Sequence, residues 1–321
     1  MVASSVRSVL VRWVRRPVMI VALMASSASA LAAQAPNERW LTIATEHFRV
    51  HFTPAVEQLA RRSAANAERA YEQLSAELPR PRGLVDLVVT GNVDFSNGSA
   101  TPFPSNRIVI HAQPPVDAIS LRFYDDWSTL VVTHELVHIF HLDRTRGWWR
   151  AAQHVFGRSP FLFPNQYLPA WAIEGIAVYY ESKLTGSGRV AGTQHRTMAR
   201  ADMLAGDFPR LADLSLATPH FPGGEQAYAL GGLFFDHLAR TRGAATIPRY
   251  LDAVAGDPIP FLLDHDARRG FGVSFRRAWR GWRVSLQAGL LPGVADGAGP
   301  EFRQLADRLW QTRAPRWRDA N

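Results

Sequence analysis

Residues 131–141, VVTHELVHIFH, constrain the fold more than any other stretch, because they predict a helix that is apolar on nearly every side. Its apolar positions, with the residue before the stretch, include Leu130, Val131, Val132, Leu136, Val137 and Ile139. A surface helix keeps a polar face, so a helix that lacks one is expected to lie inside the molecule. His134, Glu135 and His138 would then be buried too, and buried polar groups are costly unless they have a partner such as a metal ion.

The spacing of the two histidines indicates what that partner is. His134 and His138 are four residues apart, about one helical turn, and therefore project from the same face. Two such imidazoles can bind one Zn²⁺ at about 2.0–2.1 Å, and Glu135 beside them can accept a proton from a water on the metal. Random placement would give roughly 0.01 occurrences of His-Glu-x-x-His in a chain of this composition. We therefore favour a metal site over histidines that are satisfied inside an ordinary core.

A third protein ligand must come from another histidine or a carboxylate, because the chain has no cysteine. His141 is the nearest candidate, but it lies about 10.5 Å further along the helix than His134, too far to share one tetrahedral ion. We expect it to pack against the site or support it. Glu174 lies within the apolar stretch PAWAIEGIAVYY (169–180), where a carboxylate needs a metal, a charged partner or a proton. The residues alone leave Glu174 equally open as a metal ligand or as half of a buried ion pair.

The rest of the chain predicts an α+β fold in one domain. The expected strands are 40–45, 47–52, 84–90 and 107–112, with a helix over about 54–78. Later helices are expected at about 126–142, 169–183, 195–205, 225–241 and 244–255, with more beyond 260. This order predicts a small N-terminal mixed or antiparallel sheet packed on a mainly helical C-terminal part. The core is expected over about 40–255, followed by a helical extension over 256–321.

Residues 1–35 have the pattern of a secretory signal peptide, which leaves residues 36–321 as the folded domain. Arginines precede an apolar stretch that ends in small residues with Ala-x-Ala spacing, so cleavage is expected near Ala30 to Ala35. An extracytoplasmic location, periplasmic or secreted, follows, with an uncleaved membrane anchor as the alternative. The apolar stretch is short for a bilayer, and no stable membrane span is expected after cleavage.

The formal net charge of +8 first suggests a nucleic-acid or membrane partner. Four arginines and no acid lie in residues 1–32, so the remainder carries 8 − 4 = +4. The richest basic stretch, residues 267–286, interleaves Arg with Phe and Trp at helical spacing. That spacing favours a solvated basic face opposite a buried aromatic stripe, and we expect no nucleic-acid partner.

HELVH (134–138) followed by PAWAIEGIAVYY resembles the gluzincins, zinc peptidases with His-Glu-x-x-His on one helix and a glutamate ligand on the next. Over about residues 40–255 the likeness is greatest to bacterial peptidase MA-like domains, in which elements similar to EHFRVHF, SNGSATPFPSNRIVI and AYALGGLFF follow in this order. The resemblance implies a zincin-like fold, with His134, His138 and Glu174 as zinc ligands and Glu135 as the general base.

The chain also departs from that family. It lacks the Gly-x-Met-x-Asn substrate motif of the aminopeptidase branch, and its gap between His138 and Glu174 is longer than in that branch. Removal of N-terminal residues from a substrate is therefore not supported. Nothing after residue 260 resembles the C-terminal propeller that family members often carry.

Two further elements are candidates for the chemistry. EQAYALGGLFF (225–235) resembles the Tyr-x-x-Gly of aminopeptidase-type gluzincins, which implies that Tyr228 donates a hydrogen bond to the developing oxyanion. A plain packing role for Tyr228 is equally open, and Tyr179 and Tyr180 are lesser candidates for the donor. The strand at 107–112, RIVIHA, is expected to be an edge strand that pairs with an extended substrate, or else a plain strand of the sheet. The loop over 91–106 is expected to be a rim of the cleft or an ordinary surface loop.

Together these features predict an exported zinc-dependent peptidase, with an endopeptidase favoured, that acts on a peptide or protein substrate. The alternative is a catalytically idle module of zincin-like fold that binds proteins or the cell envelope. The complete His-Glu-His-Glu set argues against that alternative, since a protein that had lost its activity would be expected to have replaced Glu135 first. The sequence does not indicate whether the protein is a monomer or an oligomer.

Overall fold

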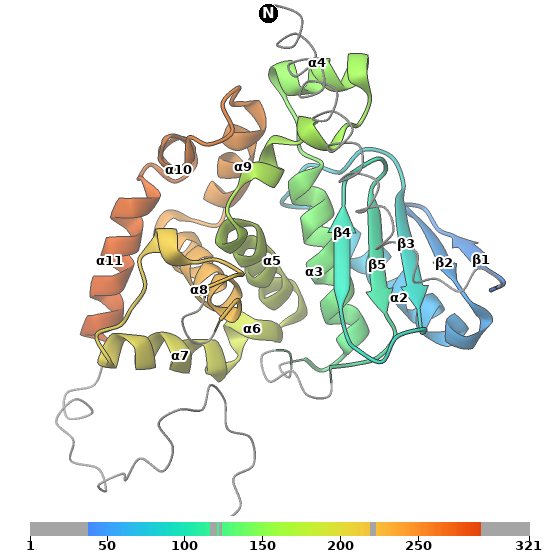
Figure 1. Cartoon of the computed structure of the whole chain (residues 1–321), viewed down its shortest axis with the longest axis horizontal. Helices are drawn as coiled ribbons and strands as arrows, with labels where there is room; N and C mark the ends of the chain where they lie inside the picture. Colours follow the sequence, from blue (N-terminus) through green and yellow to red (C-terminus); the bar gives the residue numbers. More distant parts are fainter. Residues whose placement is uncertain (1–37, 116–120, 122–123, 219–222, 290–321) are drawn as a thin grey trace, which may run out of the picture. The chain divides into compact units, whose positions relative to one another are not determined.

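The computed structural model describes residues 38–115, 121, 124–218 and 223–289, and Figure 1 shows how their strands and helices are arranged. The predicted signal peptide, residues 1–35, lies outside the described residues, as does the C-terminal extension after residue 289. Within the described part, no helix combines the length and apolar character that crossing a membrane requires.

The N-terminal part is a five-stranded mixed sheet with the strand order β1-β2-β3-β5-β4. The strands are β1 (Leu41–Ala44), β2 (Phe48–Phe52), β3 (Val85–Thr90), β4 (Gly98–Thr101) and β5 (Arg107–His111). The three central strands β2, β3 and β5 run parallel, while β1 and β4 pair antiparallel at the two edges. The parallel pair β2–β3 is joined by a crossover helix, α2 (Glu57–Ser75), as parallel strands require.

One face of this sheet is buried because its strands alternate apolar and polar residues. Phe48, Val50 and Phe52 of β2 and Val85, Leu87 and Val89 of β3 are all buried. They pack on α2, whose own buried positions recur every three or four residues and include Ala60, Ala64, Ala67, Tyr71 and Leu74. The sheet and α2 thus form the layer against which the helix of the His-Glu-x-x-His motif rests.

That helix, α3 (Trp127–Leu142), lies between the sheet and the C-terminal helices, as Figure 1 shows. It packs on α2 and β4 on one side and on α5 (Ala170–Thr185) on the other, and α5 in turn packs on α8 (Glu225–Arg242). The other helices are α4 (Gly147–Phe156), α6 (Gly188–Ala191), α7 (Thr193–Leu204), α9 (Thr246–Gly256), α10 (Leu263–Phe271) and α11 (Phe275–Ala288). Nearly every residue of α3 is buried, as its composition predicts.

Helices α5 and α8 approach each other closely because both carry glycine where they cross. A Cβ atom on Gly231 would lie 2.4 Å from the carbonyl oxygen of Trp171, and one on Gly175 would lie 2.5 Å from the backbone of Gly231. Gly232 likewise leaves room for Val178. This close packing at Gly231 and Gly232 fixes Tyr228, one turn earlier in α8, relative to α5.

The predicted α+β class is confirmed, but the predicted edge strand is wrong. RIVIHA forms β5, which is hydrogen-bonded on both sides, whereas the edge strand is β4, GSAT, within the predicted loop over 91–106. Four small residues without apolar alternation carry no strand signal of their own, and β4 forms because its backbone pairs with β5. No helix was expected where the ten-residue helix α4 lies.

The basic stretch at 267–286 has the structure that its spacing predicts. On α11, Phe275, Trp279 and Trp282 are buried. They pack among the rings of Phe208 and Phe234. The arginines of α11, Arg276, Arg277, Arg280 and Arg283, are exposed. The helix is thus basic on its solvent side and aromatic on its core side.

Candidate metal centre

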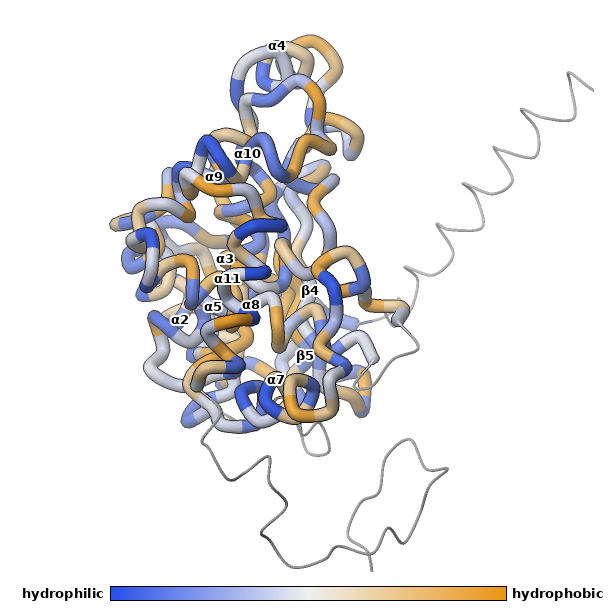
Figure 2. Tube along the Cα trace, turned by 90° about the vertical axis from the view of Figure 1, so that its left-hand side faces the viewer, coloured by the Kyte–Doolittle hydropathy of each residue, from blue (hydrophilic) through white to orange (hydrophobic). Residues whose placement is uncertain are grey.

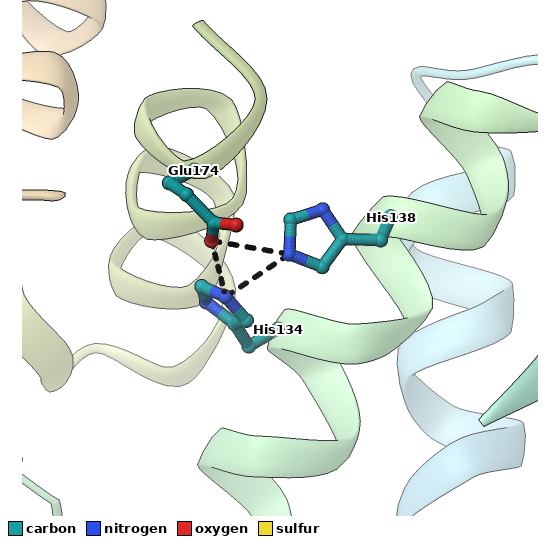
Figure 3. A group of neighbouring side chains, drawn as sticks. All are labelled: His134, His138 and Glu174. Atoms are coloured by element: carbon teal, nitrogen blue, oxygen red, sulfur yellow. Dashed lines mark hydrogen bonds and ion pairs between the residues drawn. The ribbon is translucent and has the colours of Figure 1, made fainter. Parts of the chain in front are cut away.

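Three side chains from two helices converge at one point. His134 and His138 come from α3 and Glu174 comes from α5, and Figure 3 shows their ligand atoms facing one another. The Nε2 atoms of the two histidines are 3.2 Å apart, and each lies 3.4 Å (His134) or 3.3 Å (His138) from Oε2 of Glu174. Both histidines are buried, with 6% and 7% of their surface exposed. The sequence had left Glu174 open between two roles, and the structure places it against both histidines.

These separations fit a metal ion with tetrahedral geometry. When each ligand atom lies about 2.0–2.1 Å from a tetrahedral Zn²⁺, neighbouring ligand atoms are about 3.3–3.4 Å apart. The three distances of 3.2, 3.3 and 3.4 Å match these edges. Two imidazoles and one carboxylate are also a usual donor set for zinc that leaves a fourth position for water or substrate. His134, His138 and Glu174 therefore fit Zn²⁺ in both spacing and chemistry.

The charges of the three groups are complementary. Burial alone would raise the pKa of Glu174, but the charge of His138 and the hydrogen bonds of both histidines lower it well below its usual range. Burial alone would lower the pKa of His134, yet hydrogen bonds with Glu174 and Glu181 raise it to about 9. An ionised carboxylate thus faces a point where positive charge is favoured, which suits a cation.

Glu181 and Arg189 form a support for His134 that the sequence did not predict. Glu181 is fully buried on α5, and its Oε2 lies 2.7 Å from Nδ1 of His134. Arg189 of α6 donates to both carboxylate oxygens of Glu181, over 3.0 Å from Nε and 2.8 Å from Nη2. We infer that Nδ1 donates its proton to Glu181, so that Nε2, which faces Glu174 and the metal position, is the nitrogen that can bind a metal ion once its own proton is displaced.

The turn between α5 and α6 makes this support possible. α5 ends at Gly186, which has φ +70° and so terminates the helix in the left-handed conformation. Gly188 has φ +84°, and a Cβ atom there would lie 2.9 Å from Oγ of Ser182 and 3.1 Å from Oε1 of Glu181. Glycine is therefore needed for the chain to turn back and bring Arg189 onto Glu181. The only sequence signal for Glu181 was a second acid at the end of an apolar helix.

Glu135 lies in the same cavity, directly against the edge strand. It is 6% exposed, and burial raises the pKa of its carboxyl above the ordinary value. A Cβ atom on Gly98 of β4 would lie 2.6 Å from Oε1 of Glu135, so the bare backbone of β4 is what allows the contact. A carboxylate with a raised pKa is suited to accept a proton and return it.

The cavity around these groups has a volume of about 430 Å³. Its walls come from β4 (Gly98, Ser99, Ala100), α3, α5 and α8, and they include Glu225 and Arg189. A larger cavity of about 610 Å³, lined by Trp171, Phe261 and Phe275, lies elsewhere and contains none of the three convergent ligands. The chemistry therefore belongs to the smaller cavity.

Tyr228 lines this smaller cavity. Its ring centroid lies 6.5 Å from that of His134. The guanidinium carbon Cζ of Arg189 lies 4.9 Å from the same ring centroid of Tyr228. Burial raises the pKa of Tyr228, and the charge of Glu174 raises it further, so the phenol stays protonated at pH 7. Tyr179 and Tyr180 are not among the residues that line this cavity.

His141 lies outside the convergent group. It is fully buried, and burial lowers its pKa to about 3, so the ring is neutral at pH 7. A second set of possible ligands, Asp257, His265 and Asp266, lies where α9 leads into α10. Its histidine Nε2 is 3.8 Å from Oδ2 of Asp257, and the His265 side chain is 53% exposed.

No protein-family model matches this chain. The chain is 27% identical over 212 residues to an uncharacterized protein of Treponema pallidum (strain Nichols), an alignment that covers 64% of this chain and 18% of that protein. Among solved structures, yeast LTA4 hydrolase in complex with bestatin matches with a TM-score of 0.40 and 12% identity, over 78% of this chain and 38% of that chain. The chain therefore spans only a minor part of the length of either protein.

Proposed function

We propose that this protein is a zinc-dependent peptidase, and specifically an endopeptidase. The observation that carries the proposal is the set of three ligand atoms at 3.2–3.4 Å with the Glu135 carboxyl in the same cavity. A zinc ion held by His134, His138 and Glu174 would lower the pKa of a water and polarise the carbonyl of a peptide bond.

Other side chains have the remaining roles in the proposed reaction. Glu135 accepts the proton of the attacking water and passes it to the leaving amine, for which its raised pKa is suited. The phenol of Tyr228 stays neutral and donates a hydrogen bond to the oxygen that gains negative charge. Glu181 and Arg189 hold His134 in the tautomer that directs Nε2 at the metal.

The edge of the sheet supports a peptide as the substrate. β4 is hydrogen-bonded to β5 on one side, so its other side offers backbone donors and acceptors for an extended chain. Its residues Gly98 to Ala100 line the cavity beside Glu135, and their small side chains allow a substrate backbone to come close. An extended segment bound along β4 does not need a free terminus, which favours an endopeptidase.

The test combines metal content with hydrolysis of a mixed peptide pool. Wild type should hold one zinc per chain and cleave peptides internally. Glu135→Gln should keep the zinc and lose about 10²–10⁴-fold in kcat, because the amide cannot accept the proton. The matched control is Asp266→Asn, another buried acid replaced by its amide, which should keep full activity. Activity of Glu135→Gln within a few-fold of wild type would contradict the proposal.

We also propose that the protein is exported, on the strength of residues 1–35 alone. N-terminal sequencing of the protein from its native host should find a mature terminus within Ala30 to Asn37. An intact Met1 on a soluble cytoplasmic protein would contradict export and leave the peptidase proposal untouched.

A further inference from the structure

Among the described residues that line the cavity of the metal centre, Glu225 is a charged one to which the proposed reaction gives no role. It is the first residue of α8, its side chain is 38% exposed, and Tyr228 follows three residues later. Residues three apart lie on the same face of a helix, about 5–6 Å from each other. Figure 2 shows hydrophilic and hydrophobic residues intermixed along the described trace, so hydropathy does not set Glu225 apart and its contacts must be compared.

The carboxylate of Glu225 has no hydrogen-bond partner in the part of the chain that the structure describes. Its Oε2 is enclosed and lies 3.9 Å from Nε2 of His195, which is too long for a hydrogen bond. His195 is fully buried, and burial lowers its pKa to about 4, so at pH 7 the ring has no charge that could balance the carboxylate. Oε1 is not enclosed in this way, and it is therefore the oxygen available to a ligand in the cavity.

The other charges of the cavity are matched. Arg189 donates to Glu181 over 3.0 Å from Nε and 2.8 Å from Nη2, and no ion pair joins it to Glu225. The two negative charges of Glu135 and Glu174 match the two positive charges of a zinc ion. Glu225 is left as an uncompensated negative charge beside the proposed reaction, and a cationic group of a ligand would complement it.

The place of Glu225 at the start of a helix does not by itself explain why it lines a cavity. A negative charge is favourable at the N-terminus of a helix, because it faces the positive end of the helix dipole. Glu57 has the same place as the first residue of α2, but it lies on the surface and pairs with Arg61 over 2.7 Å. Glu57 and Glu225 thus share the helix position and differ in their surroundings.

We propose that Glu225 determines the specificity of the cavity by binding the basic side chain, lysine or arginine, of a peptide substrate. This inference rests on the proposed function, in which Tyr228 donates to the oxygen of the scissile carbonyl. Glu225 lies one turn from Tyr228, a distance that the long stem of lysine or arginine can span from a residue beside the scissile bond. The ammonium or guanidinium group then donates to Oε1 of Glu225.

The free edge of β4 favours a side chain over the amino terminus of the substrate. An α-amino group carries the same charge as lysine, and Glu225 could bind it only where the substrate begins inside the cavity. A segment paired along β4 continues on both sides of the scissile bond, so the cation nearest to Glu225 is that of an internal side chain. The two sources of positive charge can be distinguished with peptides that are blocked at their amino ends.

The test measures binding, so that its outcome does not depend on hydrolysis. Decapeptides of alternating alanine and serine are blocked at both ends, carry an uncharged coumarin label, and have lysine or norleucine at one central position. Norleucine has the stem of lysine without the ammonium group. Fluorescence anisotropy gives their affinities for the zinc-loaded variant Glu135→Gln, in which the proposed base is removed. We expect the lysine peptide to bind about tenfold more tightly, the size of one hydrogen bond between charged groups.

Substitutions at Glu225 are combined with Glu135→Gln. Adding Glu225→Gln should make the affinities of the lysine and norleucine peptides equal. Adding Glu57→Gln is the matched control, since it removes a carboxylate from the same helix position outside the cavity, and it should keep the tenfold preference. Adding Glu225→Arg should reverse the preference, so that a peptide with a central glutamate binds more tightly than the lysine peptide. A residue that only stabilised its helix would not cause this reversal, and circular dichroism checks that each variant is folded.

Equal affinities for the lysine and norleucine peptides before Glu225 is changed would overturn the inference, and so would a preference that survives in Glu225→Gln. Tighter binding of a norleucine peptide with a free amino end than of the blocked lysine peptide would assign Glu225 to the amino terminus and overturn it as well. Hydrolysis by the wild type separates this inference from the proposed function. A lysine preference without hydrolysis supports the Glu225 site and contradicts the peptidase, whereas hydrolysis without a lysine preference does the reverse.

Discussion

Among the residues that the structure describes, two groups of three histidine and carboxylate side chains could hold a metal ion, and they differ in how closely the fold brings their ligand atoms together. In the first, His134, His138 and Glu174 come from two long packed helices and their ligand atoms lie within 3.4 Å of one another. In the second, Asp257 caps the end of α9 while His265 and Asp266 lie at the start of α10, and the pair His265–Asp257 is 3.8 Å apart with a half-exposed imidazole. The same residue types thus form a fixed site in one place and a loose cluster in the other.

The clusters also differ in the sign of the charges that face each other. In the first, a carboxylate faces two imidazoles, and the pKa of Glu174 is lowered. In the second, two carboxylates face each other, and burial together with the charge of Asp257 raises the pKa of Asp266 to about 7. A shared proton can satisfy such a pair at neutral pH. Residue types alone therefore do not predict a metal site, whereas the geometry and charge of the side chains do.

The largest effect should appear in metal content. Glu174→Ala removes one of three arranged ligands, so we expect the chain to lose its zinc or to bind it far more weakly. Asp266→Ala should leave one zinc per chain, and so should His141→Ala, whose side chain lies outside the first cluster. Metal analysis after dialysis checks all three. Two zinc ions per wild-type chain, with one lost in Asp266→Ala, would show that both clusters bind zinc and would contradict this prediction.

The next effect concerns the chemistry that surrounds the first cluster. Tyr228→Phe removes one hydroxyl from the cavity and should lower kcat by about 10²–10³-fold while zinc content and folding stay intact, the size expected for one oxyanion donor. Tyr179→Phe is the control, because that ring is buried on α5 and does not line the cavity. An unchanged kcat in Tyr228→Phe would return the residue to a packing role.

The first cluster also has a buried carboxylate and arginine that support His134, and among the described residues the imidazole of His265 has no such buried pair. Glu181→Gln keeps the shape of the side chain but removes the charge that holds the Nδ1 proton of His134 and the ion pair with Arg189. We expect zinc affinity to fall about 10–100-fold, the usual effect of such supporting groups. Competition with a chelator measures it, and Glu77→Gln on the surface is the control. Equal affinities in both variants would show that the helices alone hold the site.

How much of this could be predicted from the sequence depends on the distance over which each contact forms. The relative placement of His134, Glu135 and His138 was predictable because it is set within one helical turn, whereas for Glu174 the apolar helix predicted only that the carboxylate needs a partner. β4 was not, since GSAT has no alternation and becomes a strand only by pairing with β5. Arg189 was not either, because only the turn at Gly188 returns it to Glu181.

The smallest effect is a difference in how stability depends on pH. The pKa of Asp266 in the folded chain, about 7, lies above its ordinary value of 3.8, so the folded state binds this proton more tightly than the unfolded state does. Its contribution to stability is therefore greatest below about pH 4 and declines as the pH rises through about 7. Asp266→Asn cannot ionise, and its stability relative to wild type should improve between pH 5 and pH 8.

Asp264, two residues earlier, supplies a control of opposite sign. Burial alone would raise its pKa, but the hydrogen bonds and charge of Arg276 lower it, so its contribution is present at neutral pH and is lost on acidification. Asp264→Asn should then lose stability relative to wild type as the pH rises. The difference between the folded pKa of Asp266, about 7, and its ordinary pKa of 3.8 would correspond to about 4 kcal/mol in the free energy of unfolding. Because water around the half-exposed His265 screens the pair, we expect about 1–2 kcal/mol. Urea denaturation measures both effects, for Asp266→Asn at pH 5 and pH 8 and for Asp264→Asn at pH values below and above 3.8, the ordinary pKa of its carboxyl. If the two variants respond with the same sign, the carboxylates of the second cluster do not share a proton, and its contrast with the metal centre must rest on geometry alone.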